Sequence, residues 1–375
     1  MQRVMDDMKT STFTSESVCA GHPDKICDQI SDAVLDAVLK QDPDGHVAVE
    51  TMATYDNLFV VGEVSANASV DYEKIARQEI RRLGYTEEVY HFSDHSPVTV
   101  GVHEQSREIA RGVKKKGAGD QGMMFGYACR ETRELMPLPI MLAHGLTRAI
   151  DTAREKKTIP YLRPDGKSQV TVSYQDGKPL GVTAVVLAVP HSEEVELADV
   201  KADLYKKVVL PVLERYGFSV PEKSLIVNGT GVWHTGGPAS DTGLTGRKIV
   251  VDTYGGYARV GGGCFSGKDP SKVDRSGAYA ARYIAKNIVA AGLAERAEVR
   301  LAYFIGARRP LMQEVETFGT EKVSGSAMRD FVKGLLDTSV EGIIEGLDLR
   351  RPLYKKSAAY GHFGRSEFPW EKIYK

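Results

Sequence analysis

The order of apolar patterns along the chain repeats three times, and this repetition limits the possible fold more than any other feature. Segment 21–41 has an apolar residue every four positions, at Ile26, Ile30, Val34 and Val38, which predicts a helix with one apolar face. Two strand-like runs and a second helix follow it. The same order of helix, strand, strand and helix recurs twice more. We therefore expect an α+β protein of three similar units, with mixed, mostly antiparallel sheets, because adjacent short strands form hairpins.

The individual elements follow from the spacing of apolar residues. The predicted helices are residues 21–41, 71–85, 139–157, 200–217, 274–293 and 327–336. The predicted strands are residues 46–54, 57–66, 96–104, 168–175, 180–189, 223–228, 298–306 and 312–319, and 248–254 is also strand-like. We place the three units at 11–109, 110–238 and 239–375. A doubly wound dinucleotide fold is not expected, because it alternates single strands with helices and the chain has no complete G-x-G-x-x-G.

Charge and composition exclude several classes of protein. The net charge of −1 provides no overall positive field, so we expect no nucleic-acid partner. We find no apolar run of about 18 residues and no apolar signal region at the N-terminus, which argues against membrane insertion and secretion. The four cysteines are isolated from one another and form no zinc motif. This pattern is typical of reduced cysteines, so we expect a cytoplasmic protein.

The segment 229–276 is rich in glycine and carries charges of both signs. Gly262, Gly267 and Lys268 have the spacing of a phosphate-binding P-loop, G-x-x-x-x-G-K. The next residue would then be Ser or Thr, but it is Asp269, and Pro270 stands where the P-loop helix would already have begun. The chain is therefore not a P-loop NTPase. Glycine backbone, lysines and carboxylates together still suit a metal–polyphosphate bound in another geometry.

Three shorter motifs are candidates for the same chemistry. His22, Asp24 and Lys25 stand at a helix N-terminus, which attracts anions, although a capped helix with solvated charges is the simpler interpretation. Residues 117–128 place Asp120 among glycines, in a binding loop or an irregular turn. Residues 161–171 read "YLRPDGKSQVT", which by itself is most often a hairpin turn. The long polar segment 103–122 is either disordered or a functional lid.

Taken together, these motifs resemble the S-adenosylmethionine synthases, the methionine adenosyltransferases. The matching stretches occur in order along nearly the whole chain, and they are "GHPDK", "GAGDQG", "RPDGKSQVT", "DTGLTGRK", "VDTYGG" and "GGGCFSGKDPSKVDRS". The resemblance implies three α+β repeats, a tight dimer that usually pairs into a tetramer, and active sites shared across the dimer interface. It also implies the reaction of ATP, L-methionine and water to S-adenosylmethionine, phosphate and diphosphate. In that reaction the methionine sulfur attacks C5′ of ATP, and the tripolyphosphate leaves whole before it is hydrolysed.

The resemblance also implies roles for individual residues. The implied catalytic residues are His22, Lys25, Lys167, Arg247 and Lys268. The implied ATP site comprises His22, Asp165, Lys167, Val232, Trp233, Asp241, Arg247, Lys248, Cys264 and Lys268. The implied methionine site comprises Glu63, Gln105, Asp120, Asp241, Lys272 and Ile305, of which Asp120 also lines the nucleotide site. Two Mg²⁺ ions would be held by Asp24 and Asp274, and one K⁺ by Glu50. The segment 103–122 corresponds to the loop that gates the family's site.

The segment around Trp233 departs from the family's common pattern. The chain reads "GVWHTGGP" where bacterial members commonly read "GRFVIGGP", so Trp233 replaces a phenylalanine that stacks on adenine and Val232 replaces an arginine. Tryptophan still offers an aromatic face, so we expect ATP binding to persist. Two other functions are possible for such a chain: a polyphosphatase or NTPase that has lost the methionine half-site, and a non-enzymatic nucleotide sensor or scaffold. The presence of Glu63, Gln105 and Lys272 favours the complete enzyme over both.

Overall fold

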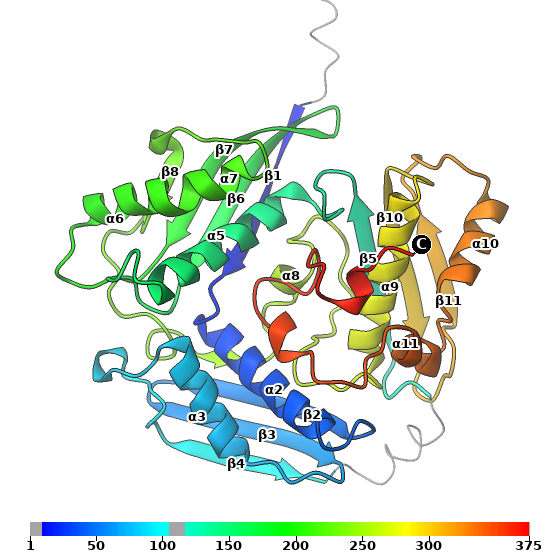
Figure 1. Ribbon diagram of the computed structural model, residues 1–375, viewed down its shortest axis with the longest axis horizontal. Helices are drawn as coiled ribbons and strands as arrows, with labels where there is room; N and C mark the ends of the chain where they lie inside the picture. The colour runs from blue at the N-terminus through cyan, green and yellow to red at the C-terminus, as the bar shows by residue number, and fades with distance from the viewer. Residues whose placement is uncertain (1–9, 105–116, 375) are drawn as a thin grey trace, which may run out of the picture.

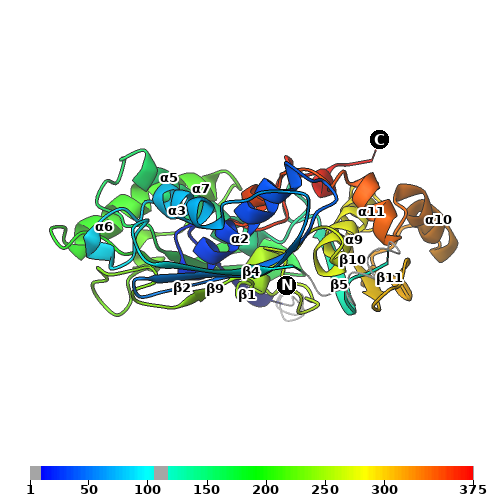
Figure 2. The same ribbon diagram turned by 90° about the horizontal axis from the view of Figure 1, so that it is seen from below.

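The computed structural model describes residues 10–104 and 117–374, which form three sheets with helices packed against them (Figure 1). Seen from the side, helices α2, α3 and α5 lie along one side of the molecule and strands β1, β2, β4 and β9 along the other (Figure 2). The predicted α+β architecture of three units with mostly antiparallel sheets is confirmed. Two strand pairs, β3 with β4 and β7 with β8, are parallel.

The first sheet has the order β4 (Val98–His103), β3 (Asn57–Ser65), β2 (His46–Thr54) and β9 (Gly243–Leu244). Helices α2 (Pro23–Leu39) and α3 (Tyr72–Leu83) pack together, and α2 lies on β2 and β9. Along β2 every second residue from Val47 to Ala53 is buried, so the residues between them, including Glu50, face away from α2. This alternation places one face of the sheet in the core and leaves the other open.

The second sheet has the order β1 (Thr10–Val18), β6 (Lys167–Gln175), β7 (Lys178–Ala188) and β8 (Leu225–Val227). It is covered by α5 (Leu138–Glu155) and by α6 (Leu197–Leu204) and α7 (Leu210–Glu214). The predicted helix 200–217 is therefore interrupted, since Tyr205–Val209 forms a π-helical turn between α6 and α7. Pro211, the second residue of α7, cannot donate a backbone hydrogen bond, which is consistent with an irregular turn before it.

The third sheet has the order β11 (Met312–Glu316), β10 (Arg296–Tyr303) and β5 (Gly122–Cys129). Helix α9 (Val273–Ala290) packs on β5 and β10, and α10 (Gly325–Leu335) and α11 (Val340–Gly346) lie beside it. The remaining short elements are α8 (Ile249–Asp252) and single 3₁₀ turns at Glu88–Tyr90, Glu222–Ser224, Lys355–Ser357 and Pro369–Glu371.

Each sheet includes a strand from a distant part of the chain. β1 belongs to the second sheet, β5 to the third and β9 to the first, so three connections cross between units. None of these three strands was among the predicted elements, because β1 is mostly polar, β5 begins in a glycine-rich motif and β9 has only two residues. The predicted boundaries between the three units, near residues 109 and 238, remain a prediction.

The strand-like interpretation of residues 248–254 is wrong. Residues Ile249–Asp252 form the short helix α8, in which the Asp252 N–H donates to the Lys248 carbonyl at 2.8 Å. Val251 and Asp252 are buried next to each other, whereas a half-buried strand would expose one of them. A run of three apolar residues has no periodicity that separates a buried strand from a buried helical turn.

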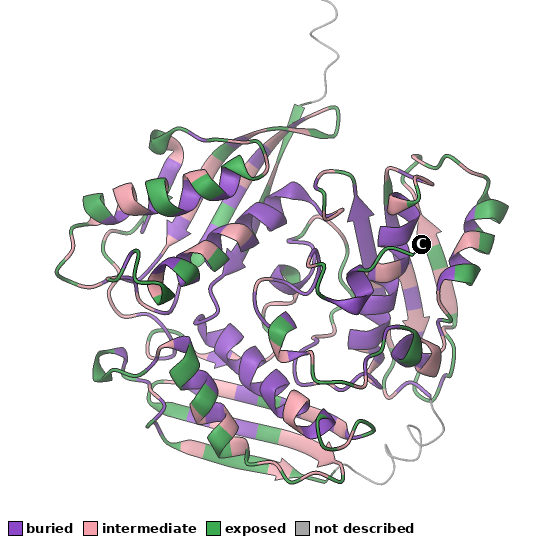
Figure 3. Cartoon of the chain, viewed as in Figure 1, coloured by how far each residue is buried: buried purple, intermediate pink, exposed green. Residues whose placement is uncertain are grey.

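Two helices connect the units and carry the core. α2 and α9 are buried along nearly their whole length (Figure 3). The C-terminal segment passes between them, where the Trp370 ring stacks on Tyr279 with centroids 3.7 Å apart. Arg282 and Lys286 of α9 both donate to the buried Glu371 carboxylate, which anchors this segment. In the described residues, no helix is long and apolar enough to span a membrane.

Candidate active site

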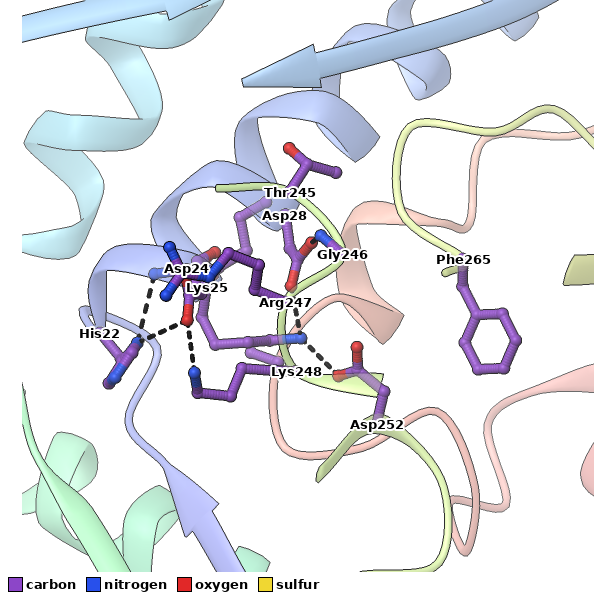
Figure 4. A network of polar contacts seen from close by, with 12 residues as sticks. His22, Asp24, Lys25, Asp28, Thr245, Gly246, Arg247, Lys248, Asp252 and Phe265 are labelled. Atoms are coloured by element: carbon purple, nitrogen blue, oxygen red, sulfur yellow. Dashed lines mark hydrogen bonds and ion pairs between the residues drawn. The ribbon is translucent and has the colours of Figure 1, made fainter. Parts of the chain in front are cut away.

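The N-terminus of α2 carries the first group of charged side chains, which we call the α2 cluster: His22, Asp24, Arg247 and Lys248 (Figure 4). His22 caps the helix, and its Nδ1 accepts a hydrogen bond from the Asp24 N–H at 3.2 Å. Asp24 accepts from the Leu244 N–H at 2.9 Å and from the Lys248 ammonium. Arg247 lies 3.7 Å from the same carboxylate. The loop that follows β9 thus supplies two cations to the start of α2.

The protonation states in the α2 cluster follow from burial and from the nearby cations. Burial, together with the charges of Lys248 and Lys167, lowers the pKa of His22 to about 3. The imidazole is therefore neutral at neutral pH, and since Nδ1 accepts a hydrogen bond, Nε2 carries the proton. Burial alone would raise the pKa of Asp24, but hydrogen bonds from Lys248 and Leu244 lower it overall. The cluster consequently contains one neutral donor, one carboxylate and two cations.

Lys25 points away from this cluster and into the core. Its side chain is 1 % exposed, and its ammonium lies 2.5 Å from Asp252 and 3.0 Å from Asp28 (Figure 4). Burial alone would lower the pKa of Lys25, but these two carboxylates raise it above its usual value. Lys25 therefore joins α2 to α8 as part of a buried ion-pair group. In this arrangement the ammonium is held by protein carboxylates, and its contact with phosphate stays a prediction.

Asp165 and Lys167, predicted for the nucleotide site, lie before and at the start of β6. Asp165 is buried and accepts hydrogen bonds from the N–H groups of Gly166 at 2.6 Å and Gly237 at 2.8 Å. Gly237 has a φ of 80°, and a methyl group there would lie 2.5 Å from the Tyr85 ring, so only glycine fits. Burial raises the pKa of Asp165 to about 6. Lys167 is exposed and close enough to His22 to lower the pKa of His22.

The departure from the family pattern lies on a loop that is held at several points. Trp233 donates from Nε1 to the Thr235 carbonyl at 2.7 Å, and its own carbonyl accepts from the His191 N–H at 3.0 Å. Val232 is 61 % exposed. Asp241 is also exposed, and its N–H donates to the Gly237 carbonyl at 3.2 Å. The loop thus presents Trp233 next to the glycines held by Asp165.

The N-terminus of α9 carries a second group, which we call the α9 cluster: Lys268, Lys272 and Asp274. The Lys268 ammonium lies 2.5 Å from the Asp274 carboxylate, and the Lys272 ammonium pairs with the buried Asp269. Burial alone would lower the pKa of Lys268, but Cys264 and Asp274 raise it. A methyl group on Gly263 would lie 2.3 Å from Asp274 Oδ1, so this glycine lets the loop approach the carboxylate.

The two clusters meet through their loops. A methyl group on Gly246, next to Arg247, would lie 2.5 Å from the Cβ of Cys264, so the loop of the α2 cluster touches the loop that leads to Lys268. Cys264 is a half-buried free cysteine, and burial raises the pKa of its thiol. The two segments that carry these predicted nucleotide residues thus touch at Gly246 and Cys264 within one chain.

The residues predicted for methionine and K⁺ have varied surroundings. Glu50 and Asp120 are both exposed. Glu63 lies 3.4 Å from the His103 ring, and Ile305 is 62 % exposed. Gln105 and most of the predicted gating segment lie outside the described residues.

Two supporting residues, Asp32 and Arg275, had no predicted role. The Arg275 guanidinium donates two parallel hydrogen bonds to Asp32, at 2.6 and 2.7 Å, and both side chains are fully buried. Arg275 also donates to the carbonyls of Phe265 and Lys268, and Asp32 accepts from the Gly267 N–H at 2.8 Å. This pair ties α2 and α9 to residues 261–268, which we call the glycine loop. The charge of Arg275 within "KVDRS" was visible in the sequence, but its partner 243 positions away was not.

The carboxylates of Asp24 and Asp274 suit Mg²⁺ ions that are bound mainly by the phosphates of a substrate. Among the residues that the structure describes, no group of three or more His, Cys, Asp or Glu side chains could hold a metal ion. Asp24 and Asp274 instead stand singly, each beside a lysine. Mg²⁺ typically binds one or two protein carboxylates together with substrate phosphates and water, so this donor set fits a metal–polyphosphate.

Comparisons with known proteins point to one family along nearly the whole chain. Three family models match: the N-terminal domain of S-adenosylmethionine synthetase over residues 10–107, its central domain over 115–233 and its C-terminal domain over 235–372. A curated S-adenosylmethionine synthase of Treponema denticola is 52 % identical over 96 % of this chain and 95 % of its own length. Those of Clostridium tetani and a Sulfurovum species are each 50 % identical, over 97 % and 96 % of this chain and 97 % and 95 % of their own lengths.

Proposed function

The chain belongs to the S-adenosylmethionine synthetase family, and we propose that it converts ATP, L-methionine and water into S-adenosylmethionine, phosphate and diphosphate. The observation that carries this proposal is the pair of clusters at the N-termini of α2 and α9. Each combines lysine with a single carboxylate at the mouth of a glycine-rich loop. We expect the protein to work in the cytoplasm.

The proposed chemistry explains why the clusters are rich in cations. A thioether sulfur carries no proton, so its attack on C5′ of ATP needs no general base. The C5′–O bond breaks as the S–C5′ bond forms, and the tripolyphosphate leaves with the bonding electrons. The protein therefore contributes alignment of sulfur, carbon and oxygen, and stabilisation of the charge that develops on the leaving oxygen. Water then cleaves the tripolyphosphate to phosphate and diphosphate.

The side chains divide this work according to their charge. The neutral His22 would donate from Nε2 to an oxygen near the breaking bond. Lys248, Arg247, Lys268 and Lys167 would bind phosphate oxygens as cations. Asp24 and Asp274 would hold Mg²⁺, which when bound supplies further neutralisation of the triphosphate. Glu50 would bind K⁺, while Glu63, Gln105, Asp120, Asp241, Lys272 and Ile305 would surround methionine.

The open side of the sheets supports a homodimer with shared active sites. Val61 on β3 and Met123 on β5 are 41 % and 43 % exposed. Glu50 is the cross-strand partner of Val61, so the predicted K⁺ ligand lies on the same open face of the first sheet. A second copy packed on this face would cover apolar side chains and enclose Glu50. We propose a homodimer of this kind, with tetramers as its pairs, to be checked by sedimentation of the purified protein.

One assay separates the proposed function from its alternatives. The protein is incubated with ATP, Mg²⁺ and K⁺, with and without methionine, and the products are measured by mass spectrometry. We expect the sulfonium product only with methionine, and its loss when the divalent cation is chelated. Phosphate release that does not depend on methionine would indicate a polyphosphatase or NTPase. Binding of ATP without turnover would indicate a sensor or scaffold.

Substitution of Trp233 tests the adenine platform. We expect Trp233→Ala to raise the KM for ATP by about 5- to 150-fold, because stacking of a base on an aromatic ring contributes about 1–3 kcal/mol. Trp233→Phe keeps the aromatic face and should remain within a few-fold of the wild type. The KM for methionine is the internal control. An unchanged KM for ATP in the alanine variant would show that the base binds elsewhere.

A further inference from the structure

Asp269, the residue that breaks the P-loop pattern, is one of the most constrained side chains near the candidate site. It is 2 % exposed. One carboxylate oxygen accepts from the Ser271 N–H at 2.8 Å, and the other accepts from the Val47 N–H at 2.8 Å and from the Lys272 ammonium. His46 Nδ1 lies 3.8 Å away. A single carboxylate therefore joins strand β2, its own turn and one lysine of the α9 cluster.

The backbone around Asp269 extends this attachment. Its N–H donates to the Val47 carbonyl at 3.1 Å, and the Val49 N–H donates to the Gly267 carbonyl at 3.0 Å. Lys268 forms an isolated antiparallel bridge with Ala48. The segment 267–269 thus runs beside β2 like a short extra strand. The Lys272 N–H then donates to the Asp269 carbonyl at 3.1 Å, which closes the turn just before α9.

We propose that Asp269 is a positioning residue that holds the Lys272 ammonium in place to receive the carboxylate of methionine. This inference rests on the proposed function. A free lysine side chain loses rotamer entropy when it is ordered, so an ammonium that is already held binds an anion at lower cost. The ammonium has three donors, and the pair with Asp269 leaves others for a ligand.

The surroundings of the pair support this direction of action. The Lys272 side chain is 12 % exposed and that of Asp269 only 2 %, so the lysine is the more accessible partner of the pair. Burial alone would raise the pKa of Asp269, but Lys272 and His46 hold it well below the usual range. Asp269 therefore stays charged, and its ion pair with Lys272 persists at neutral pH.

A double-mutant cycle tests the proposal through kcat/KM for methionine. Asp269→Asn removes the charge but keeps the size, and we expect kcat/KM for methionine to fall by about 10-fold, with a smaller change for ATP. In the Lys272→Ala background the same substitution should cause no further fall. The amide of asparagine has one acceptor oxygen, so it can accept a hydrogen bond from only one of the Val47 and Ser271 N–H groups, and some loss of stability is expected. The loss of that backbone hydrogen bond is common to both backgrounds, whereas the ion pair with Lys272 is lost only when Lys272 is present, so the difference between the backgrounds reports the pair.

Two additional variants keep the test decisive. Ser271→Ala changes the neighbouring side chain without touching the carboxylate and should leave kcat/KM for methionine within two-fold. If Asp269→Asn does not fold, Asp269→Ser replaces it, because a hydroxyl can accept the Ser271 N–H in the same turn. Equal falls in both backgrounds would overturn the positioning role and leave Asp269 as a structural residue only. A wild-type protein that forms no sulfonium would instead overturn the proposed function.

Discussion

Lys268→Ala is expected to lower kcat by about 100- to 1,000-fold while changing the affinity for ATP far less. The Lys268 ammonium is held 2.5 Å from Asp274 at the end of the glycine loop, in a partly buried site. Negative charge on the leaving triphosphate develops only as the C5′–O bond breaks. A fixed cation aimed at that charge stabilises the transition state more than bound ATP. Single-turnover rates and calorimetric ATP binding measure the two quantities separately.

A matched control for Lys268 is Lys322→Ala. Lys322 also pairs with a carboxylate, that of Glu295, but this pair is about half exposed on the third unit. Its loss should leave both kcat and ATP affinity unchanged, since exposed ion pairs contribute little. If Lys268→Ala weakened ATP binding as much as it lowered kcat/KM, with kcat intact, Lys268 would be a ground-state ligand and the proposed role would be wrong.

Arg275→Met is expected to lower the free energy of unfolding by about 3–5 kcal/mol. Arg275 and Asp32 are both fully buried, and the guanidinium also lies 4.2 Å from the Tyr354 ring centroid. Removal of the arginine leaves an uncompensated carboxylate inside the protein. The glycine loop also loses the donor to its Phe265 and Lys268 carbonyls, so kcat should fall as well. Urea unfolding followed by circular dichroism measures the change in stability.

The double variant Asp32→Asn with Arg275→Met identifies the cause. Asparagine removes the charge but keeps an acceptor for the Gly267 N–H, so much of the stability should return. Arg309→Met is the surface control, because the pair of Arg309 with Asp337 is largely exposed and its loss should cost less than about 1 kcal/mol. A loss below 1 kcal/mol for Arg275→Met would mean that the core tolerates the charge of Asp32 unpaired.

Much of the fold was predictable because its signals are local. The four-residue spacing of Ile26, Ile30 and Val34 predicted α2, and the strands that alternate buried with exposed residues were found close to their observed bounds. The missed strands β1, β5 and β9 had no comparable signal. Each is ordered by pairing with a strand far away in the chain, and periodicity within a short window does not detect such a partner.

The candidate site shows the same division. Its residue types could be chosen from the sequence, because lysine, carboxylate and glycine at these spacings suit a metal–polyphosphate whatever the fold. The directions in which the side chains point could not be predicted from the sequence. Lys25 and Asp24 are neighbours in one motif, yet successive residues of a helix point about 100° apart, so Asp24 faces Lys248 while Lys25 is buried against Asp252.

Asp269 makes the point most clearly. The sequence by itself determined that residues 261–276 do not form a P-loop, because the residue after Lys268 is a carboxylate and proline follows. Only the tertiary structure decided what that carboxylate does, because strand β2 brings the distant Val47 N–H to it and the turn before α9 directs the nearby Lys272 ammonium toward it. The chemical character of a residue can be read from the sequence, whereas the partners of its charge depend on how the chain packs around it.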